Sequence, residues 1–181
     1  MQLKDLMCIL ALVFLSIASF SQESTPFRHH QIIATIGHAA IPSSEEEGVS
    51  NEYIAVPTWG LTYEYDFNET IGIGFKSDIE LSNYQISDNQ KEILIRDYPI
   101  SLVAIVKVIP VASFGIYAGG GIELASEENL PVFDVGCTYD IDFSGRWILS
   151  PEIGYELKGG HTSIFTVGLS IGFRFGKKST V

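Results

Sequence analysis

The sequence contains little cysteine, little basic charge and, after its first 20 residues, no long apolar run. Only one of its two cysteines, Cys137, follows residue 21, so no disulfide can form within that part of the chain. Lys and Arg number 11 against 22 Asp and Glu, and the net charge of −11 gives no electrostatic basis for nucleic-acid binding. Without a later run near the ~20 residues of a spanning helix, a helical membrane protein is excluded. Because 46% of the chain is nevertheless hydrophobic, we expect an all-β protein.

The first 21 residues have the pattern of a secretory signal peptide. Lys4 precedes an apolar run from Met7 to Phe20, and small polar residues surround the expected cleavage site after Ser21. A retained membrane anchor is the alternative, but the run is shorter than the ~20 residues that a spanning helix needs. We therefore predict a signal peptide over residues 1–21 and one exported domain over residues 22–181.

Eight segments of the exported chain are typical of β-strands. Most are longer than the ~5–6 residues of soluble strands and match the ~9–11 residues of strands that cross a membrane. Long polar connections, such as residues 42–52 and 83–91, alternate with tight turns predicted at Asn68–Glu69, Ile109–Val111 and Ser144–Gly145. This alternation is typical of outer-membrane barrels. The predicted strands are residues 29–41, 53–67, 70–82, 92–109, 112–124, 131–143, 146–158 and 162–175.

Apolar and polar side chains alternate along these strands. In the last strand, Val167, Leu169 and Ile171 share one face, whereas Thr166 and Ser170 share the other. Eight strands enclose an interior that is just wide enough for small side chains, so the large apolar residues fit better outside. The pattern therefore predicts a closed, antiparallel, up-and-down transmembrane barrel with apolar residues facing lipid and a polar, mostly plugged interior.

The charged residues of the strands all fall on the polar face. A Lys or Arg facing lipid at mid-bilayer costs about 2–4 kcal/mol, so these groups are expected inside, where the bases can pair with the acids. The alternative to a hydrogen-bonded plug is a cation-selective water path, which the narrow interior disfavours. The predicted lumen network comprises Glu64, Lys76, Asp78, Lys107, Glu123, Asp134, Glu152 and Arg174.

Aromatic residues gather near the ends of the predicted strands. Rings with an apolar body and a polar edge prefer the interface between lipid and water. The antiparallel order brings one group to the end with the tight turns, where both chain termini also lie. This predicted girdle comprises Tyr65, Phe67, Phe143, Trp147, Phe173 and Phe175.

The signal peptide, the eight alternating strands and a last strand that ends Gly172-Phe173-Arg174-Phe175 together resemble the small eight-stranded outer-membrane barrels of Gram-negative bacteria, the OmpA/OmpX-like proteins. The resemblance covers residues 27 to 176 and is one of architecture. It implies an outer-membrane location, contact with membrane lipid and lipopolysaccharide, and recognition of the final strand by the barrel-assembly machinery. Because members of this group have different roles, the resemblance does not fix a function.

The sequence favours a non-catalytic role in envelope structure, surface interaction or minor solute passage, without cofactor or metal. The acidic run Glu45–Glu47 is interpreted as a solvated surface loop. One alternative is an outer-membrane lipid A deacylase that uses His161 and Ser163, with Glu156 as the nearest acid. Another is a secreted, lipocalin-like barrel that binds a hydrophobic ligand, which requires the apolar face inside.

Overall fold

The fold was analysed in a computed structural model that describes residues 27–42, 53–87, 93–111, 113–159 and 162–176. The predicted signal peptide, Glu45–Glu47 and His161 lie outside these residues. The strands are β1 (His30–Pro42), β2 (Tyr53–Asp66), β3 (Ile71–Glu80), β4 (Asn83–Ser87), β5 (Ile93–Asp97), β6 (Ile100–Val111), β7 (Phe114–Leu124), β8 (Leu130–Tyr139), β9 (Ile141–Asp142), β10 (Trp147–Lys158) and β11 (Thr162–Phe175).

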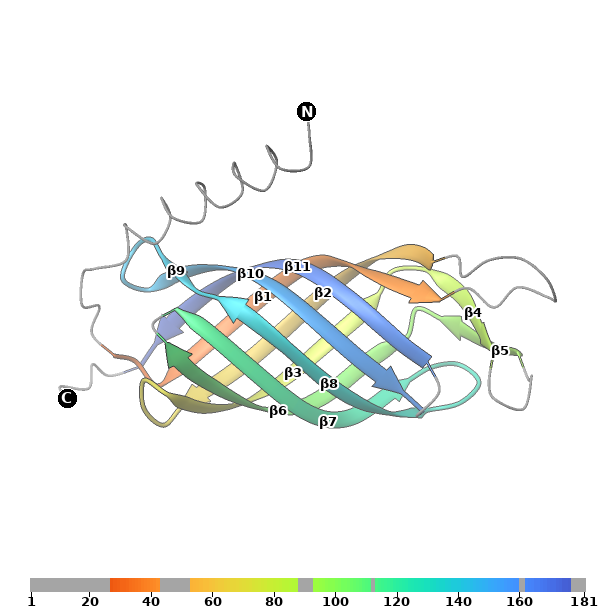
Figure 1. The fold of residues 1–181 in the computed structure, drawn as a ribbon, viewed down its shortest axis with the longest axis horizontal. Coiled ribbons are helices and arrows are strands. Elements are labelled where there is room, and N and C mark those ends of the chain that lie inside the picture. Colours follow the sequence, from red (N-terminus) through yellow and green to blue (C-terminus); the bar gives the residue numbers. More distant parts are fainter. Residues whose placement is uncertain (1–26, 43–52, 88–92, 112, 160–161, 177–181) are drawn as a thin grey trace, which may run out of the picture.

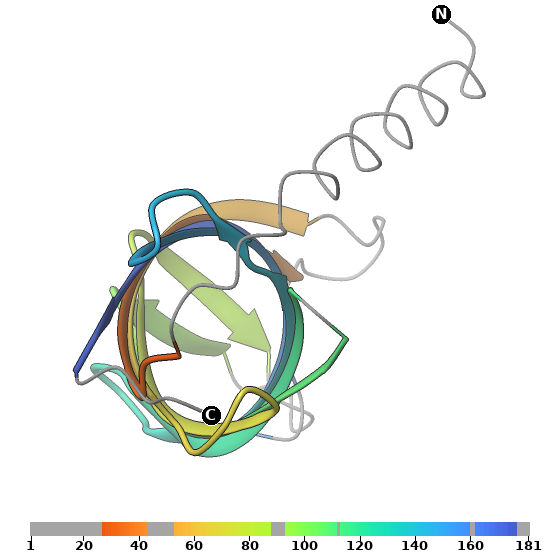
Figure 2. The same cartoon turned by 90° about the vertical axis from the view of Figure 1, so that its left-hand side faces the viewer.

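The long strands form one closed antiparallel sheet. Each pairs with its neighbours in the order β1, β2, β3, β6, β7, β8, β10 and β11, and β11 pairs back to β1. Short β9 continues the line of β8 along β10. The ring is seen from the side in Figure 1 and end-on in Figure 2. The predicted eight-stranded up-and-down barrel is therefore confirmed.

The two ends of the barrel differ. At one end, here called the turn end, tight turns join β2 to β3, β6 to β7 and β9 to β10; the other end is called the loop end. Asn68 Oδ1 accepts hydrogen bonds from the backbone amides of Thr70 and Ile71 at 2.8 and 2.9 Å, which fixes the first turn. Gly145 has φ of 60°, a conformation that suits glycine in the β9–β10 turn. Both turns lie where the sequence predicts them.

A hairpin at the loop end was not predicted. The sequence assigns residues 83–91 to a loop and residues 92–109 to one strand, whereas β4 and β5 form a separate two-stranded sheet. The expected strand is interrupted where Tyr98 adopts φ of 45° and Pro99 lacks an amide hydrogen. Seen through the ring in Figure 2, this yellow-green hairpin lies across the far opening.

The turn predicted at Ile109–Val111 is also misplaced. Strand β6 continues to Val111, and its register with β7 shifts between Val108 and Val111. Pro110 lies inside this irregular stretch, where a residue without an amide hydrogen is tolerated. The chain turns beyond it, next to Ser113, whose φ is 71°.

The two faces of the wall differ in charge: the outer face is apolar, and the inner face carries the ions together with some apolar side chains, such as Val103 and Ile105. The side chains of Ile36, Leu61, Phe75 and Leu169 are exposed on the outer face, while Glu64 on the inner face is buried. Among the described residues of the eight long strands, no Asp, Glu, Lys or Arg lies on the outer face. This orientation is opposite to the one that a lipocalin-like binder requires. Within the described ranges there is no helix long and apolar enough to cross a membrane.

Candidate functional site: the polar lumen

The lumen holds more carboxylates than cations. Most of its charged side chains come from alternate residues of β2, β3, β6, β7, β8 and β10, because those positions face inward; Asp140 lies between β8 and β9, and Arg96 belongs to the β4–β5 hairpin. Most are less than a tenth exposed, so each charge depends on partners rather than on bulk water. The described carboxylates are Glu64, Asp66, Asp78, Glu80, Glu123, Asp134, Asp140, Glu152 and Glu156; the cations are Lys76, Arg96, Lys107 and Lys158.

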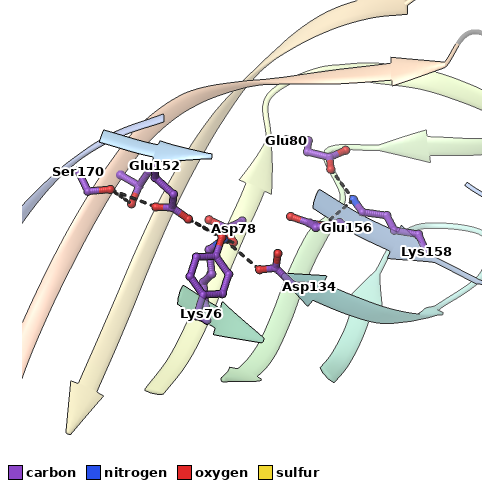
Figure 3. A network of polar contacts seen from close by, with 10 residues as sticks. Lys76, Asp78, Glu80, Asp134, Glu152, Glu156, Lys158 and Ser170 are labelled. Atoms are coloured by element: carbon purple, nitrogen blue, oxygen red, sulfur yellow. Dashed lines mark hydrogen bonds and ion pairs between the residues drawn. The ribbon is translucent and has the colours of Figure 1, made fainter. Parts of the chain in front are cut away.

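Lys76 is at the centre of the lumen, in what we call the central cluster. Its Nζ lies 3.0 Å from Asp134 Oδ2, 3.1 Å from Glu152 Oε1 and 3.5 Å from Asp78 Oδ2. The residues come from β3, β8 and β10, so the cluster joins three strands across the interior (Figure 3). Three carboxylates around one ammonium group offset the cost of burying it.

Hydroxyl groups complete the central cluster. Tyr117 Oη accepts a hydrogen bond from Lys76 Nζ at 3.1 Å and donates one to Glu152 Oε1 at 2.7 Å. Ser170 Oγ donates to the other oxygen of Glu152 at 3.3 Å. Glycine makes room for the phenol ring, since a Cβ on Gly136 would lie 2.4 Å from Tyr117 Oη. The glycines on the polar face are therefore part of the packing of the network.

A second group, the turn-end cluster, surrounds Lys107. Its Nζ lies 3.1 Å from Glu64 Oε2 and 3.5 Å from Asp140 Oδ2. Ser150 Oγ donates to the second oxygen of Asp140 at 2.7 Å. Asp140 separates β8 from β9, which interrupts the strand predicted over residues 131–143.

Arg174 is closer to the opening at the turn end. Its Nη1 lies 2.6 Å from Asp142 Oδ1, and its Nε donates to Gln31 Oε1 at 3.3 Å. Arg174 forms no ion pair with the carboxylates of the predicted network, all of which the structure describes, and its side chain is partly exposed at the rim. Next to it, Arg28 Nη1 donates to the carbonyl oxygen of Gly176 at 2.6 Å and ties the two ends of the barrel chain together.

The third group, the loop-end cluster, surrounds Lys158 on β10. Its Nζ is paired with Glu80 Oε1, lies 2.5 Å from Glu123 Oε2 and lies 3.6 Å from Glu156 Oε2. Lys158 is 1% exposed and Glu123 is fully buried, so this ion pair is shielded from solvent. Three strands, β3, β7 and β10, thus contribute acids to the loop-end cluster, and one ammonium group neutralises part of their charge.

The β4–β5 hairpin is attached to the loop-end cluster. Arg96 is fully buried, with Nη1 3.4 Å from Glu123 Oε1 and hydrogen-bonded to the backbone carbonyl of Glu128. Tyr84 donates its hydroxyl hydrogen to Glu80, and burial raises the pKa of this phenol so that it stays protonated. Ile95 N–H donates to Glu127 Oε2 at 2.8 Å. The hairpin is therefore held over the loop end by both of its strands.

Arg96→Ala is expected to loosen this hairpin. A hydrogen bond to a charged group contributes about 1.5–3 kcal/mol, so its loss raises the open population about tenfold or more. Proteinase K cleavage of the hairpin in the folded, detergent-bound protein measures this change. Asp97→Ala is the matched control, because Asp97 on the same strand is exposed. An unchanged cleavage rate in Arg96→Ala contradicts the proposed attachment.

Little space is left between the clusters. One cavity of about 20 Å³ lies between the turn-end and central clusters and is lined by Glu64, Lys107 and Tyr117. A second of about 20 Å³ lies between the central and loop-end clusters and is lined by Asp78 and Glu156. Each has room for about one water molecule. Side chains thus constrict the described lumen at three levels.

The structure brings seven of the eight residues of the predicted network into the three clusters and leaves Arg174 at the rim. Sequence reasoning left out several residues that complete the clusters. Most of them occupy inward-facing positions in the alternating pattern of the barrel strands, and this position could have identified them. Arg96 could not be identified in this way, because it belongs to the hairpin and not to a barrel strand. The omitted residues are Glu80, Arg96, Tyr117, Asp140, Glu156 and Lys158.

The residues of the predicted aromatic girdle lie at the turn end. The rings of Trp147 and Phe173 are 4.9 Å apart, and those of Tyr65 and Phe67 are 5.3 Å apart. Phe175 stacks on His30 at 5.3 Å across the β1–β11 pair. Phe143 is 57% exposed next to the β9–β10 turn. The rings therefore form part of the outer surface at the end where the chain enters and leaves the barrel.

The candidate hydrolase residues are not brought together where the structure describes them. Ser163 pairs with Leu157 on the outward face, whereas Glu156 points into the lumen and is 4% exposed. A catalytic acid must reach the base that it orients, and the barrel wall separates this acid from Ser163. Among the described residues, no three His, Cys, Asp or Glu side chains are arranged to hold a metal ion.

No protein family model matches the sequence, and no curated protein matches it. Ail, the attachment invasion locus protein of Yersinia pestis, has a similar structure, with 14% identity, 82% of this chain and 100% of that chain covered, and a TM-score of 0.50. Neisserial surface protein A covers 81% of this chain and 97% of its own, at 12% identity and a TM-score of 0.48. The N-terminal barrel domain of Pseudomonas aeruginosa OprF covers 82% and 98%, at 13% identity and a TM-score of 0.47. Ail is an outer-membrane protein. The similarity of structure and the closed ring of strands show that this chain has the fold of the small eight-stranded outer-membrane barrels.

Proposed function

We propose that this protein is a non-catalytic barrel of the outer membrane that displays the β4–β5 hairpin and its neighbouring loops at the cell surface. The single observation that carries the proposal is the separation of chemistry across the wall. Apolar side chains such as Ile73 and Leu169 cover the outside, while paired ions fill the inside. A protein surrounded by water has its apolar side chains inside and its charged ones outside. A barrel surrounded by a lipid bilayer has the apolar outside and charged inside found here.

The closed lumen supports a structural or surface role over solute passage. A pore needs a continuous water-filled path, whereas the three clusters leave cavities of about 20 Å³. Breaking a buried ion pair to open such a path is costly. We therefore propose that the ion clusters stiffen the barrel and that the loop end carries the biological role.

The proposed surface element is acidic and partly apolar. Glu127 and Glu128 hold β5, and Ile95 and Tyr98 are 44% and 53% exposed beside them. A hairpin fixed in this way presents its exposed residues with little loss of conformational entropy when a partner binds. Membrane lipid and lipopolysaccharide are the proposed surroundings of the wall, and the barrel-assembly machinery is the proposed partner during insertion.

Cell fractionation combined with gel migration tests the location. We expect the protein in the outer-membrane fraction, cleaved after Ser21, and migrating differently with and without heating in detergent. Planar-bilayer recordings of the purified protein are expected to show no conductance steps. A freely soluble periplasmic protein contradicts the proposed location, and stable conductance contradicts the sealed lumen.

A further inference from the structure

The cavity between the central and loop-end clusters has polar atoms without partners. Its polar lining consists of the hydroxyl-bearing residues Thr35, Thr58 and Thr166, the acids Asp78, Glu80, Glu152 and Glu156, and one cation, Lys76. Within the described part of the chain, Thr58 and Thr166 make no side-chain hydrogen bond. Glu156 is 4% exposed, yet its Oε2 accepts no hydrogen bond and has only Lys158 Nζ at 3.6 Å. A buried carboxylate oxygen without a hydrogen bond is costly, so this site is suited to a further ligand.

The charges around this cavity indicate the sign of that ligand. The central and loop-end clusters hold six carboxylates and only three cations. Figure 3 shows part of this group, with Asp78, Glu156 and Lys158 labelled. Asp78 Oδ2 has no hydrogen bond either, and its nearest cation, Lys76 Nζ, lies 3.5 Å away. A positive ligand lowers the repulsion between the remaining acids, whereas an anion increases it. The acids are Asp78, Glu80, Glu123, Asp134, Glu152 and Glu156, and the cations are Lys76, Arg96 and Lys158.

The size of the cavity indicates the class of cation. A volume of about 20 Å³ accommodates one ion or water and leaves no room for the several waters that Mg²⁺ keeps. Ca²⁺ needs six to eight oxygen ligands, and among the described residues no three His, Cys, Asp or Glu side chains are arranged to hold a metal ion. A monovalent ion requires fewer ligands, and hydroxyl oxygens can supply part of them.

We propose that this cavity binds a small monovalent cation such as Na⁺ between Thr58, Thr166 and Glu156. The ion offsets part of the excess negative charge inside the barrel and thereby stabilises the closed lumen. This proposal depends on the barrel interior alone and is independent of the surface role proposed above.

Thermal unfolding of the full protein in detergent, at constant ionic strength, tests the site. Replacing N-methylglucamine chloride with NaCl is expected to raise the unfolding midpoint by about 3–5 °C, because a ligand that binds only the folded state stabilises it. N-Methylglucamine is too large for the cavity and reproduces the screening by salt. LiCl and KCl are included to determine which alkali ion fits best.

Thr166→Val removes one ligand without changing charge and is expected to abolish the sodium-specific shift. Thr58→Val provides a second variant if the first does not fold. Thr138→Val is the matched control, because Thr138 lines the other lumen cavity and should leave the shift unchanged. Equal midpoints in sodium and N-methylglucamine overturn the proposal, as does a shift that persists in both cavity variants. A midpoint that changes only with pH also overturns it, because protons then neutralise the acids.

Discussion

Replacing Lys76 with methionine is expected to lower the free energy of unfolding by about 3–5 kcal/mol, the usual cost of breaking a buried ion pair. Lys76 is 5% exposed and is the cation that Asp78, Asp134 and Glu152 share. Because methionine fills a similar volume, the decrease in the free energy of unfolding measures the loss of the charge rather than a loss of packing. Urea unfolding of the purified barrel in lipid vesicles, followed by tryptophan fluorescence, measures the effect.

Two further variants separate the ion network from a general effect of substitution. Adding Asp134→Asn and Glu152→Gln to Lys76→Met removes the charges left without a partner and is expected to restore about half or more of the lost stability. Arg146→Met is the control, because Arg146 is exposed in the turn before β10. If Lys76→Met unfolds at the same urea concentration as the original protein, the central cluster does not stabilise the barrel.

Arginine in place of Leu169 is expected to destabilise the membrane-inserted barrel by about 2–4 kcal/mol. Leu169 is 45% exposed on the outer face, midway along β11, between Ile36 and Pro151 of the neighbouring strands. On a surface that faces water, the same substitution changes the free energy of unfolding by no more than about 0.5 kcal/mol in either direction. The size of the loss in urea unfolding from vesicles therefore distinguishes lipid from water around this residue.

Val111→Arg is the matched control for this prediction. Val111 is 67% exposed and lies at the turn end, where the cost of a lipid-facing arginine falls to about 0–1 kcal/mol. We expect Leu169→Arg to lose much more stability than Val111→Arg. Equal losses for the two variants contradict a bilayer centred on the middle of the strands.

The parity of side chains made most of the barrel predictable. Successive side chains of a strand point to opposite faces, so once Val167 and Leu169 are assigned to the outside, Ser170 must face inside. The same rule predicts that Glu64 and Lys76 face inside. The strand register and the closure of the barrel bring Lys76 next to Asp134, which is 58 residues away in the sequence. A local sequence pattern cannot predict a contact between residues so far apart. Parity thus gives the face of each residue but not its partner.

The hairpin shows where local patterns fail. Residues 92–97 and 100–109 are apolar enough that the sequence predicts one continuous strand over both segments. In the structure, the interruption at Tyr98–Pro99 divides it into two strands. No local pattern marks Arg96 as buried, yet it is completely buried, with Glu123 and the carbonyl of Glu128 as its polar partners. Its role depends on contacts with β7 and the β7–β8 loop, which propensity and periodicity do not encode.

The central claim, that lipid surrounds the apolar wall and that ions fill the lumen, is tested most directly by the accessibility of spin labels. Single cysteines replace Ile73, Leu169 or Asp78 in a Cys137→Ser background, and each labelled protein is inserted into lipid vesicles. We predict that labels at positions 73 and 169 collide with oxygen, which dissolves in lipid, more than with a water-soluble nickel chelate, and that the label at position 78 collides weakly with oxygen. A label at position 169 that meets the nickel chelate more than oxygen, together with an oxygen-accessible label at position 78, would contradict the account.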